Sequence, residues 1–113
     1  MKKIAVPADD GRVSAHFGHC PSFEIFEADE AVGVVLSRSR QPAPAHEPGK
    51  IPRWLKELGV DIVLSGGMGR RALELFHEIG IEAVVGVSGL SVDEAVEGYL
   101  KGSLRLQGNA CDH

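Results

Sequence analysis

The sequence has few aromatic residues, only two cysteines, no long apolar run and no excess of positive charge. Aromatic residues make up 5% of the 113 residues. No apolar run approaches the ~20 residues that a membrane-spanning helix needs. The apolar stretch after Lys2 and Lys3 is too short for a secretory signal. These absences predict a cytoplasmic protein without a membrane partner, whose cysteines stay reduced. Two cysteines so far apart in such a chain are expected to be free thiols or metal ligands rather than a disulfide.

The charge balance argues against a nucleic-acid partner. The net charge is −4, with 12 Lys and Arg residues scattered along the chain. A protein that binds a phosphate backbone needs a face rich in lysine or arginine. The length fits a single domain over residues 1–113, which buries about two-thirds of its unfolded surface and needs no disulfide or structural metal to fold.

Hydrophobic patterning predicts a mixture of strands and helices. Strands are expected over residues 3–8, 22–28, 31–37, 60–64 and 81–85, with a short extended piece around Val13. Residues 22–28 and 31–37 are close enough to form an antiparallel hairpin. Helices are expected over residues 51–58 and 70–79, and from a capping box at Ser91 and Glu94. Residues 38–49, with three prolines, are expected to form a long loop that is a candidate for function.

The element order predicts one α/β domain with a mixed sheet of about five strands and about three helices. Right-handed crossovers place helices against such a sheet, and ligands favour the carboxyl ends of its parallel strands. The loop after the first strand and the turn at residues 65–69 would both lie at that edge if their strands are parallel neighbours.

The turn at residues 65–69 is rich in glycine and precedes a helix. Gly67-Met68-Gly69-Arg70-Arg71-Ala72 formally matches a dinucleotide-binding pattern. However, the acidic residue expected at the end of the next strand is missing. Two interpretations remain open. Backbone amides at the helix start, with Arg70 and Arg71, would attract an anion, or the glycines only allow close packing of the helix on the sheet.

Histidine and cysteine gather in two short stretches. His16, His19 and Cys20 follow the first strand, and Cys111 and His113 lie at the other end of the sequence. Imidazole and thiolate bind zinc, copper, iron and iron–sulfur centres, although neither spacing is that of a zinc finger. Metal binding by these five residues is therefore a hypothesis. A catalytic Cys20 is less favoured, because no acid is evident to orient a neighbouring histidine.

The order of several motifs resembles the dinitrogenase iron–molybdenum cofactor biosynthesis family, which includes NifX, NafY and the C-terminal domain of NifB. The resemblance covers essentially the whole chain. It rests on residues 3–7, the stretch 13–20 with its His-Phe-Gly element, residues 49–55 and 59–61, the Gly-Gly-Met-Gly stretch within 65–72, and the terminal Cys-Asp-His.

This resemblance implies a ribonuclease-H-like fold that binds or carries an anionic metal–sulfur cluster without catalysis. The cargo would be similar to the iron–molybdenum cofactor or another molybdenum, iron or copper sulfide cluster. His16 is the best candidate for contact with the cluster, and His46 lies in a loop where many members have histidine. The expected binding residues are His16, Phe17, Gly18, His46, Gly66, Gly67, Met68, Gly69 and Arg70. Cys20 and the Cys-Asp-His end are shared mainly with small stand-alone members.

Two functions from different classes follow. The first is a carrier in cofactor biosynthesis, monomeric or weakly oligomeric, whose partners are proteins that donate or accept the cluster. The second is a mononuclear metal-binding or thiol redox-sensing module that uses Cys20 and Cys111. An enzyme is not expected, because no catalytic set of residues stands out. The radical-SAM chemistry of a complete NifB-type enzyme would also need three cysteines, and the chain has two.

Overall fold

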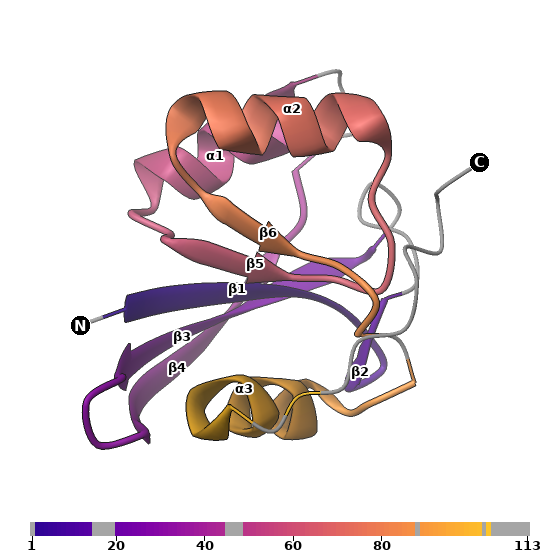
Figure 1. Cartoon of the computed structure of the whole chain (residues 1–113). Helices are drawn as coiled ribbons and strands as arrows, with labels where there is room; N and C mark the ends of the chain where they lie inside the picture. Colours follow the sequence, from indigo (N-terminus) through magenta and orange to yellow (C-terminus); the bar gives the residue numbers. More distant parts are fainter. Residues whose placement is uncertain (1, 15–19, 45–48, 88, 103, 105–113) are drawn as a thin grey trace.

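The fold is taken from a computed structural model, which describes residues 2–14, 20–44, 49–87, 89–102 and 104 (Figure 1). Six strands form one mixed sheet: β1 (Lys2–Asp9), β2 (Arg12–Val13), β3 (Ser22–Asp29), β4 (Val34–Pro42), β5 (Ile62–Leu64) and β6 (Glu82–Val84). Its order is β4-β3-β1-β5-β6, and β2 pairs with β1. The strands β1, β5 and β6 are parallel to one another, and β2, β3 and β4 join by antiparallel pairing.

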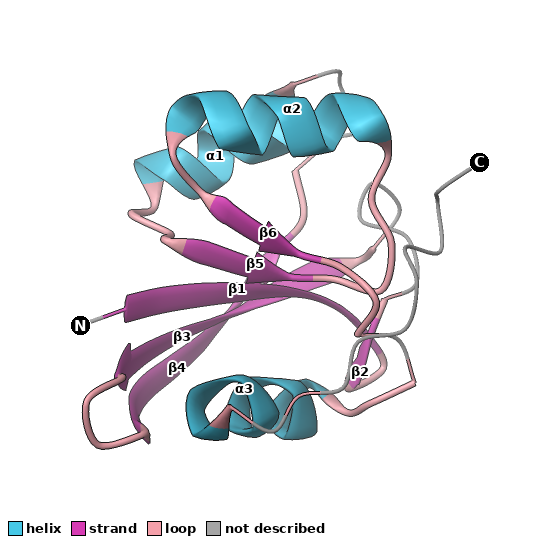
Figure 2. Ribbon diagram, viewed as in Figure 1, coloured by secondary structure: helices cyan, strands magenta, loops and turns pink. Residues whose placement is uncertain are grey.

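Three helices cover the two faces of the sheet. The helices α1 (Lys50–Glu57) and α2 (Arg70–Ile79) lie on one face, and α3 (Val92–Lys101) lies on the other (Figure 2). Because successive residues of a strand point to opposite faces, the central strand β1 contributes to two separate cores. Ile4, Val6 and Ala8 pack on the side of α3, whereas Ala5 packs on the side of α1 and α2. The predicted α/β domain with a mixed sheet and three helices is confirmed.

Helix ends follow the local signals in the sequence. The helix α2 has the predicted bounds and ends at Gly80, whose φ of 79° is left-handed and suits glycine. At the start of α3, the Ser91 hydroxyl accepts from the Glu94 amide at 3.1 Å, and the Glu94 carboxylate accepts from the Ser91 amide at 3.0 Å. These bonds lower the pKa of the Glu94 carboxyl below its usual value. None of the helices in the described part of the chain has the length and apolar character needed to cross a membrane.

The bounds predicted for the strand that corresponds to β4 are wrong. A strand was expected over residues 31–37 with a loop from residue 38, but β4 runs from Val34 to Pro42. Residues 31–33 instead belong to the turn, where the Asp29 carboxylate and carbonyl accept from the amides of Ala31 and Gly33. The strand continues past residue 37 because its later residues keep their pairing with β3 as far as Pro42 opposite Ser22. The connection to α1 is correspondingly shorter than predicted.

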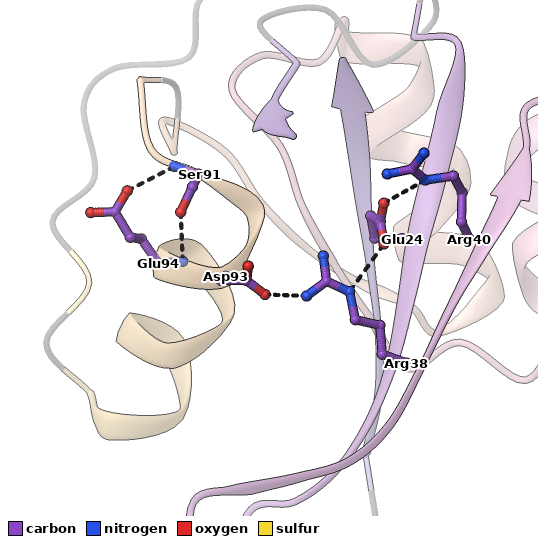
Figure 3. A network of polar contacts seen from close by, with 6 residues as sticks. All are labelled: Glu24, Arg38, Arg40, Ser91, Asp93 and Glu94. Carbon is purple, nitrogen blue, oxygen red and sulfur yellow. Dashed lines mark hydrogen bonds and ion pairs between the residues drawn. The ribbon is translucent and has the colours of Figure 1, made fainter. Parts of the chain in front are cut away.

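A buried carboxylate explains why the arginines of β4 stay in the strand. Glu24 on β3 has a side chain that is 3% exposed, and it accepts from Arg38 Nε at 3.3 Å and Arg40 Nε at 2.9 Å. Arg38 also pairs with Asp93 in the first turn of α3 at 2.5 Å (Figure 3). The network therefore ties the outer strand both to the sheet and to α3. A charge as buried as that of Glu24 requires such partners.

We expect the double substitution Arg38→Gln and Arg40→Gln to lower the free energy of unfolding by about 2–3 kcal/mol, because it leaves the buried Glu24 carboxylate without a cation. Urea denaturation followed by circular dichroism measures this loss. Adding Glu24→Leu should restore part of the stability, because an apolar side chain needs no cation. The exposed Lys56→Gln is the control, expected within about 0.5 kcal/mol of the unmodified protein. A double variant as stable as that control would contradict this role of the arginines.

Candidate functional site

The carboxyl ends of the parallel strands meet at one edge of the sheet, as predicted. The strand β1 pairs in parallel with β5 through Ile4 opposite Ile62 and Ala5 opposite Val63, and β5 pairs in the same way with β6. Backbone hydrogen bonds continue this arrangement beyond the strands. The Gly66 amide donates to the Ser14 carbonyl at 3.1 Å, and the Gly86 amide donates to the Gly66 carbonyl at 3.2 Å. The connections that follow β1, β5 and β6 are thereby held side by side at this edge.

Both ends of the predicted His-Phe-Gly-His loop are fixed at this edge. On one side, the Ser14 amide donates to the Pro7 carbonyl at 2.8 Å, and its carbonyl accepts from the glycine turn. On the other side, Cys20 lies next to β3, and the Pro21 carbonyl accepts from the Ala43 amide at 3.1 Å after the end of β4. The loop between these anchors therefore starts beside the glycine turn, at Ser14, and ends between the start of β3 and the end of β4.

Several predicted site residues lie outside the described residues, so their roles stay predictions. They are His16, Phe17, Gly18, His19, His46, Cys111 and His113. Within the described ranges, no group of three or more His, Cys, Asp or Glu side chains is placed to hold a metal ion. A closed metal site at this edge would therefore need ligands from the undescribed positions.

Cys20 is the predicted metal ligand that the structure does place. Its side chain is buried, with the residue 8% exposed, in the core shared with Phe23, Met68 and Phe76. Burial raises the pKa of the Cys20 thiol to about 11, with a smaller contribution from the negative charge of Asp9, while backbone hydrogen bonds of Cys20 and Ala8 act in the opposite direction. The thiol is therefore protonated at neutral pH. This disfavours a rapidly reacting thiol and hence the redox-sensing alternative.

The glycine turn connects β5 to α2 and is largely buried. Ser65 is fully buried, and its hydroxyl donates to the Gly67 carbonyl at 3.0 Å. Met68 is 1% exposed, so its side chain anchors the turn in the core. Gly69 is exposed, and a Cβ atom built on it meets nothing within 4 Å. Close packing therefore does not explain a glycine at position 69.

The start of α2 offers backbone amides and positive charge. Gly69 is the N-cap and provides no side-chain hydrogen bond, and the first turn has no acidic residue. Arg70 and Arg71 are exposed at this end. Because the first amides of a helix lack partners within the helix and carry partial positive charge, such an end attracts an anion.

A second helix start without a side-chain cap lies at the same edge. The N-cap of α1 is Gly49, and its first turn also has no acidic residue. The other end of α1 is near the start of β1, where Lys3 Nζ donates to the Leu58 carbonyl at 2.8 Å, so the first turn lies toward the carboxyl ends. A Cβ atom on Gly49 would be 3.9 Å from Leu75 of α2, which places the start of α1 against α2.

This second helix start was not among the binding residues predicted from the sequence. The sequence did contain a sign of an uncapped helix start. Gly49 stands before Lys50, at the position where a helix capped by a side chain would have Ser, Thr, Asp or Asn. Lys50 and Arg53 add positive charge to the first turn of α1, as Arg70 and Arg71 do in α2. In contrast, α3 has a complete capping box and two acidic residues in its first turn. Only α1 and α2 of the three described helices therefore present uncapped, basic starts.

We expect iodoacetamide to modify Cys20 much more slowly in the folded protein than in urea. At pH 8 a thiol with a pKa near 11 has roughly 100-fold less thiolate than an ordinary cysteine, and burial slows access further. The rate should rise with pH toward the raised pKa. Peptide mass spectrometry measures Cys20 separately from Cys111. Equal rates at Cys20 in the folded and urea-unfolded protein would contradict the buried, protonated thiol.

Comparisons with known proteins place the chain in a family. Residues 1–102 match the family described as dinitrogenase iron-molybdenum cofactor. An uncharacterised protein of Methanocaldococcus jannaschii, MJ0580, is 30% identical over 107 residues, which cover 92% of this chain and 90% of that protein.

Solved structures have the same fold. The crystal structure of PH0822 is 31% identical with a TM-score of 0.88, and the match covers 98% of this chain and 99% of that one. The apo form of the orange protein from Desulfovibrio gigas is 24% identical with a TM-score of 0.77, covering 96% of this chain and 95% of that one. The family match over residues 1–102 and the 30% identity to MJ0580 make the chain a member of the dinitrogenase iron-molybdenum cofactor family.

Proposed function

We propose that the protein binds and carries an anionic metal–sulfur cluster at the carboxyl edge of its sheet, without catalysing a reaction. The single observation that carries this proposal is the pair of uncapped, basic helix starts at that edge, at Gly49 and Gly69. Membership in the dinitrogenase iron-molybdenum cofactor family supports the kind of cargo.

The chemistry of such a cargo fits this edge. A metal–sulfur cluster is large, soft and anionic, and its sulfides accept hydrogen bonds from amides and guanidinium groups. The starts of α1 and α2 supply amides, and Arg53 and Arg70 supply guanidinium groups. His16 is the proposed metal contact, assisted by Phe17 and Gly18 of the same loop.

The remaining predicted residues have different proposed roles. His46 belongs to the connection that precedes α1 and would approach the same edge. His19, Cys111 and His113 are proposed as further ligands that this chain adds. Cys20 would have to lose its proton before binding a metal, so its contribution is expected to be slower and dependent on pH.

A carrier must release its cargo to another protein. Few covalent ligands combined with many hydrogen bonds hold a cluster less permanently than four cysteines do. This supports carriage in cofactor biosynthesis or transfer, with donor and acceptor proteins as partners. The candidate metals of the cluster are molybdenum, iron and copper, and the experiment below distinguishes them.

Anaerobic reconstitution tests this proposal directly. The protein is incubated with sulfide and iron, molybdate or copper, desalted, and examined by absorption spectroscopy and metal analysis. We expect charge-transfer bands and a fixed metal content for at least one metal. His16→Ala should reduce the bound metal strongly, whereas His77→Ala, at an exposed position in the last turn of α2, should leave it unchanged. A colourless protein with every metal would refute the proposal.

A second pair of variants isolates the contribution of a backbone amide. Gly69 has a φ of −67°, which proline also adopts, and a Cβ atom built on it meets nothing within 4 Å. Gly69→Pro therefore removes one amide hydrogen at the helix start, and Gly69→Ala keeps it. We expect Gly69→Pro to weaken retention of the cluster roughly tenfold or more, consistent with the loss of a hydrogen bond to a charged group. If the alanine variant weakens retention equally, the amide is not the cause.

A further inference from the structure

The strand β4 forms an unusually exposed outer edge of the sheet. It is the last strand in the order β4-β3-β1-β5-β6, and eight of its nine residues are exposed. Typical strands are about five or six residues long, and natural proteins usually keep edge strands short, covered or interrupted by a bulge. The one irregularity of the β3–β4 pairing lies near Glu27 and Ala28, toward the hairpin. The rest of the β3–β4 pairing is regular, so this part of the edge has no bulge.

The edge has two halves of different chemistry. The half next to the hairpin presents Val34, Val35 and Leu36, which are 47%, 41% and 55% exposed. The other half presents Arg38 and Arg40, and β4 contains no acidic residue. Because the whole chain carries a net charge of −4, this basic strand stands out against the charge of the protein.

The two arginines are held in place before any partner arrives. Their Nε atoms donate to the buried Glu24 carboxylate, yet their side chains remain 45% and 68% exposed. Among the described residues, Arg40 has Glu24 as its one ion-pair partner (Figure 3). The terminal nitrogens of Arg40 are therefore available to a further acceptor. A guanidinium group ordered in advance loses less conformational entropy on binding.

A second copy of the chain is a poor partner for this edge. In a two-fold antiparallel pair centred on Arg38 or Arg40, an arginine faces its own copy. In a pair centred on Ser39, Arg38 faces Arg40 twice. Like charges directly opposite each other destabilise a sheet. A pair centred on Ser37 avoids this repulsion, but it places Arg38 opposite Leu36 and Arg40 opposite Val34, so neither arginine faces an acidic partner.

We propose that β4 is a docking strand for an extended, acidic segment of another protein, which adds to the sheet beside β4. Its carboxylates would face Arg38 and Arg40, and its apolar residues would cover Val34 to Leu36. Backbone hydrogen bonds along the edge supply affinity, and the side chains supply specificity. The same arginines that repel a second copy select an acidic partner. This inference does not depend on the proposed cargo, so its tests use the protein without metal.

A synthetic peptide tests the inference without changing the protein. The probe is fluorescein-labelled Thr-Glu-Thr-Glu-Thr-Val-Thr-Val, with carboxylates in the half that would face the arginines. Fluorescence anisotropy measures its affinity at low salt. We expect saturable binding, and we expect lysine in place of both glutamates to weaken it roughly tenfold or more, because opposite charges become like charges. Equal affinity for the two peptides, or no binding of either, would overturn the proposal.

Two methylated peptides then distinguish strand addition from simple charge attraction. In a strand, alternate amides point toward the neighbouring strand. N-methylation of the odd or of the even residues should therefore abolish binding in one peptide and spare it in the other. Binding of both as well as the parent would show that no strand is added.

Protein variants complete the test. Arg40→Gln should weaken binding of the acidic peptide about two- to fivefold, as expected for an exposed ion pair. Lys56→Gln removes the same charge on α1, on the opposite face of the sheet, and should have no effect. Circular dichroism confirms that both variants are folded. A protein that forms dimers through β4 in sedimentation experiments, and loses them with Leu36→Glu, would instead identify a second copy as the occupant and contradict the proposal.

Discussion

The parallel pairing of β1 with β5 is the contact on which the arrangement of the site depends. Ile4, Ala5, Ile62 and Val63 are fully buried at this pairing, and they contribute to the cores on both faces of the sheet. The pairing brings the connection after β1 and the glycine turn after β5 to one edge, although they are some fifty residues apart in sequence. Hydrogen bonds from Gly66 to Ser14 and from Gly86 to Gly66 then fix these connections to each other.

The three helices differ in whether side chains cap the amides of their first turns, and on this basis they fall into two kinds. In α3, Ser91 and Glu94 satisfy the amides with their own side chains, and the Arg38–Asp93 pair ties this end to the outer strand. In α1 and α2, glycine occupies the N-cap and basic residues follow. An uncapped helix start keeps its capacity to bind an anion. The structural role therefore falls to α3, and the proposed binding role falls to α1 and α2.

The sequence predicted the fold well because its local signals agreed with each other. Apolar spacing and Gly80 located α2 to the residue, and Ser91 with Glu94 located α3. It failed at β4, because the polar pattern from Arg38 to Gln41 resembles a loop unless Glu24 on the neighbouring strand is known. The buried state of Cys20 was also beyond prediction, since it depends on a core that Met68 and Phe76 share from distant parts of the sequence. The roles of His16 and His46 remain predictions based on family resemblance.

Amide chemical shifts test most directly whether an anionic metal sulfide binds between the two uncapped helix starts. Tetrathiomolybdate is a diamagnetic probe of this class and can be added to ¹⁵N-labelled protein under anaerobic conditions. We expect saturable shifts at Gly49–Ile51 and Gly67–Arg71, with the amides of Ser91–Glu94 unchanged because the side chains of Ser91 and Glu94 already cap that helix start. Shifts confined to other parts of the sheet, or no shifts at all, would contradict the proposed site.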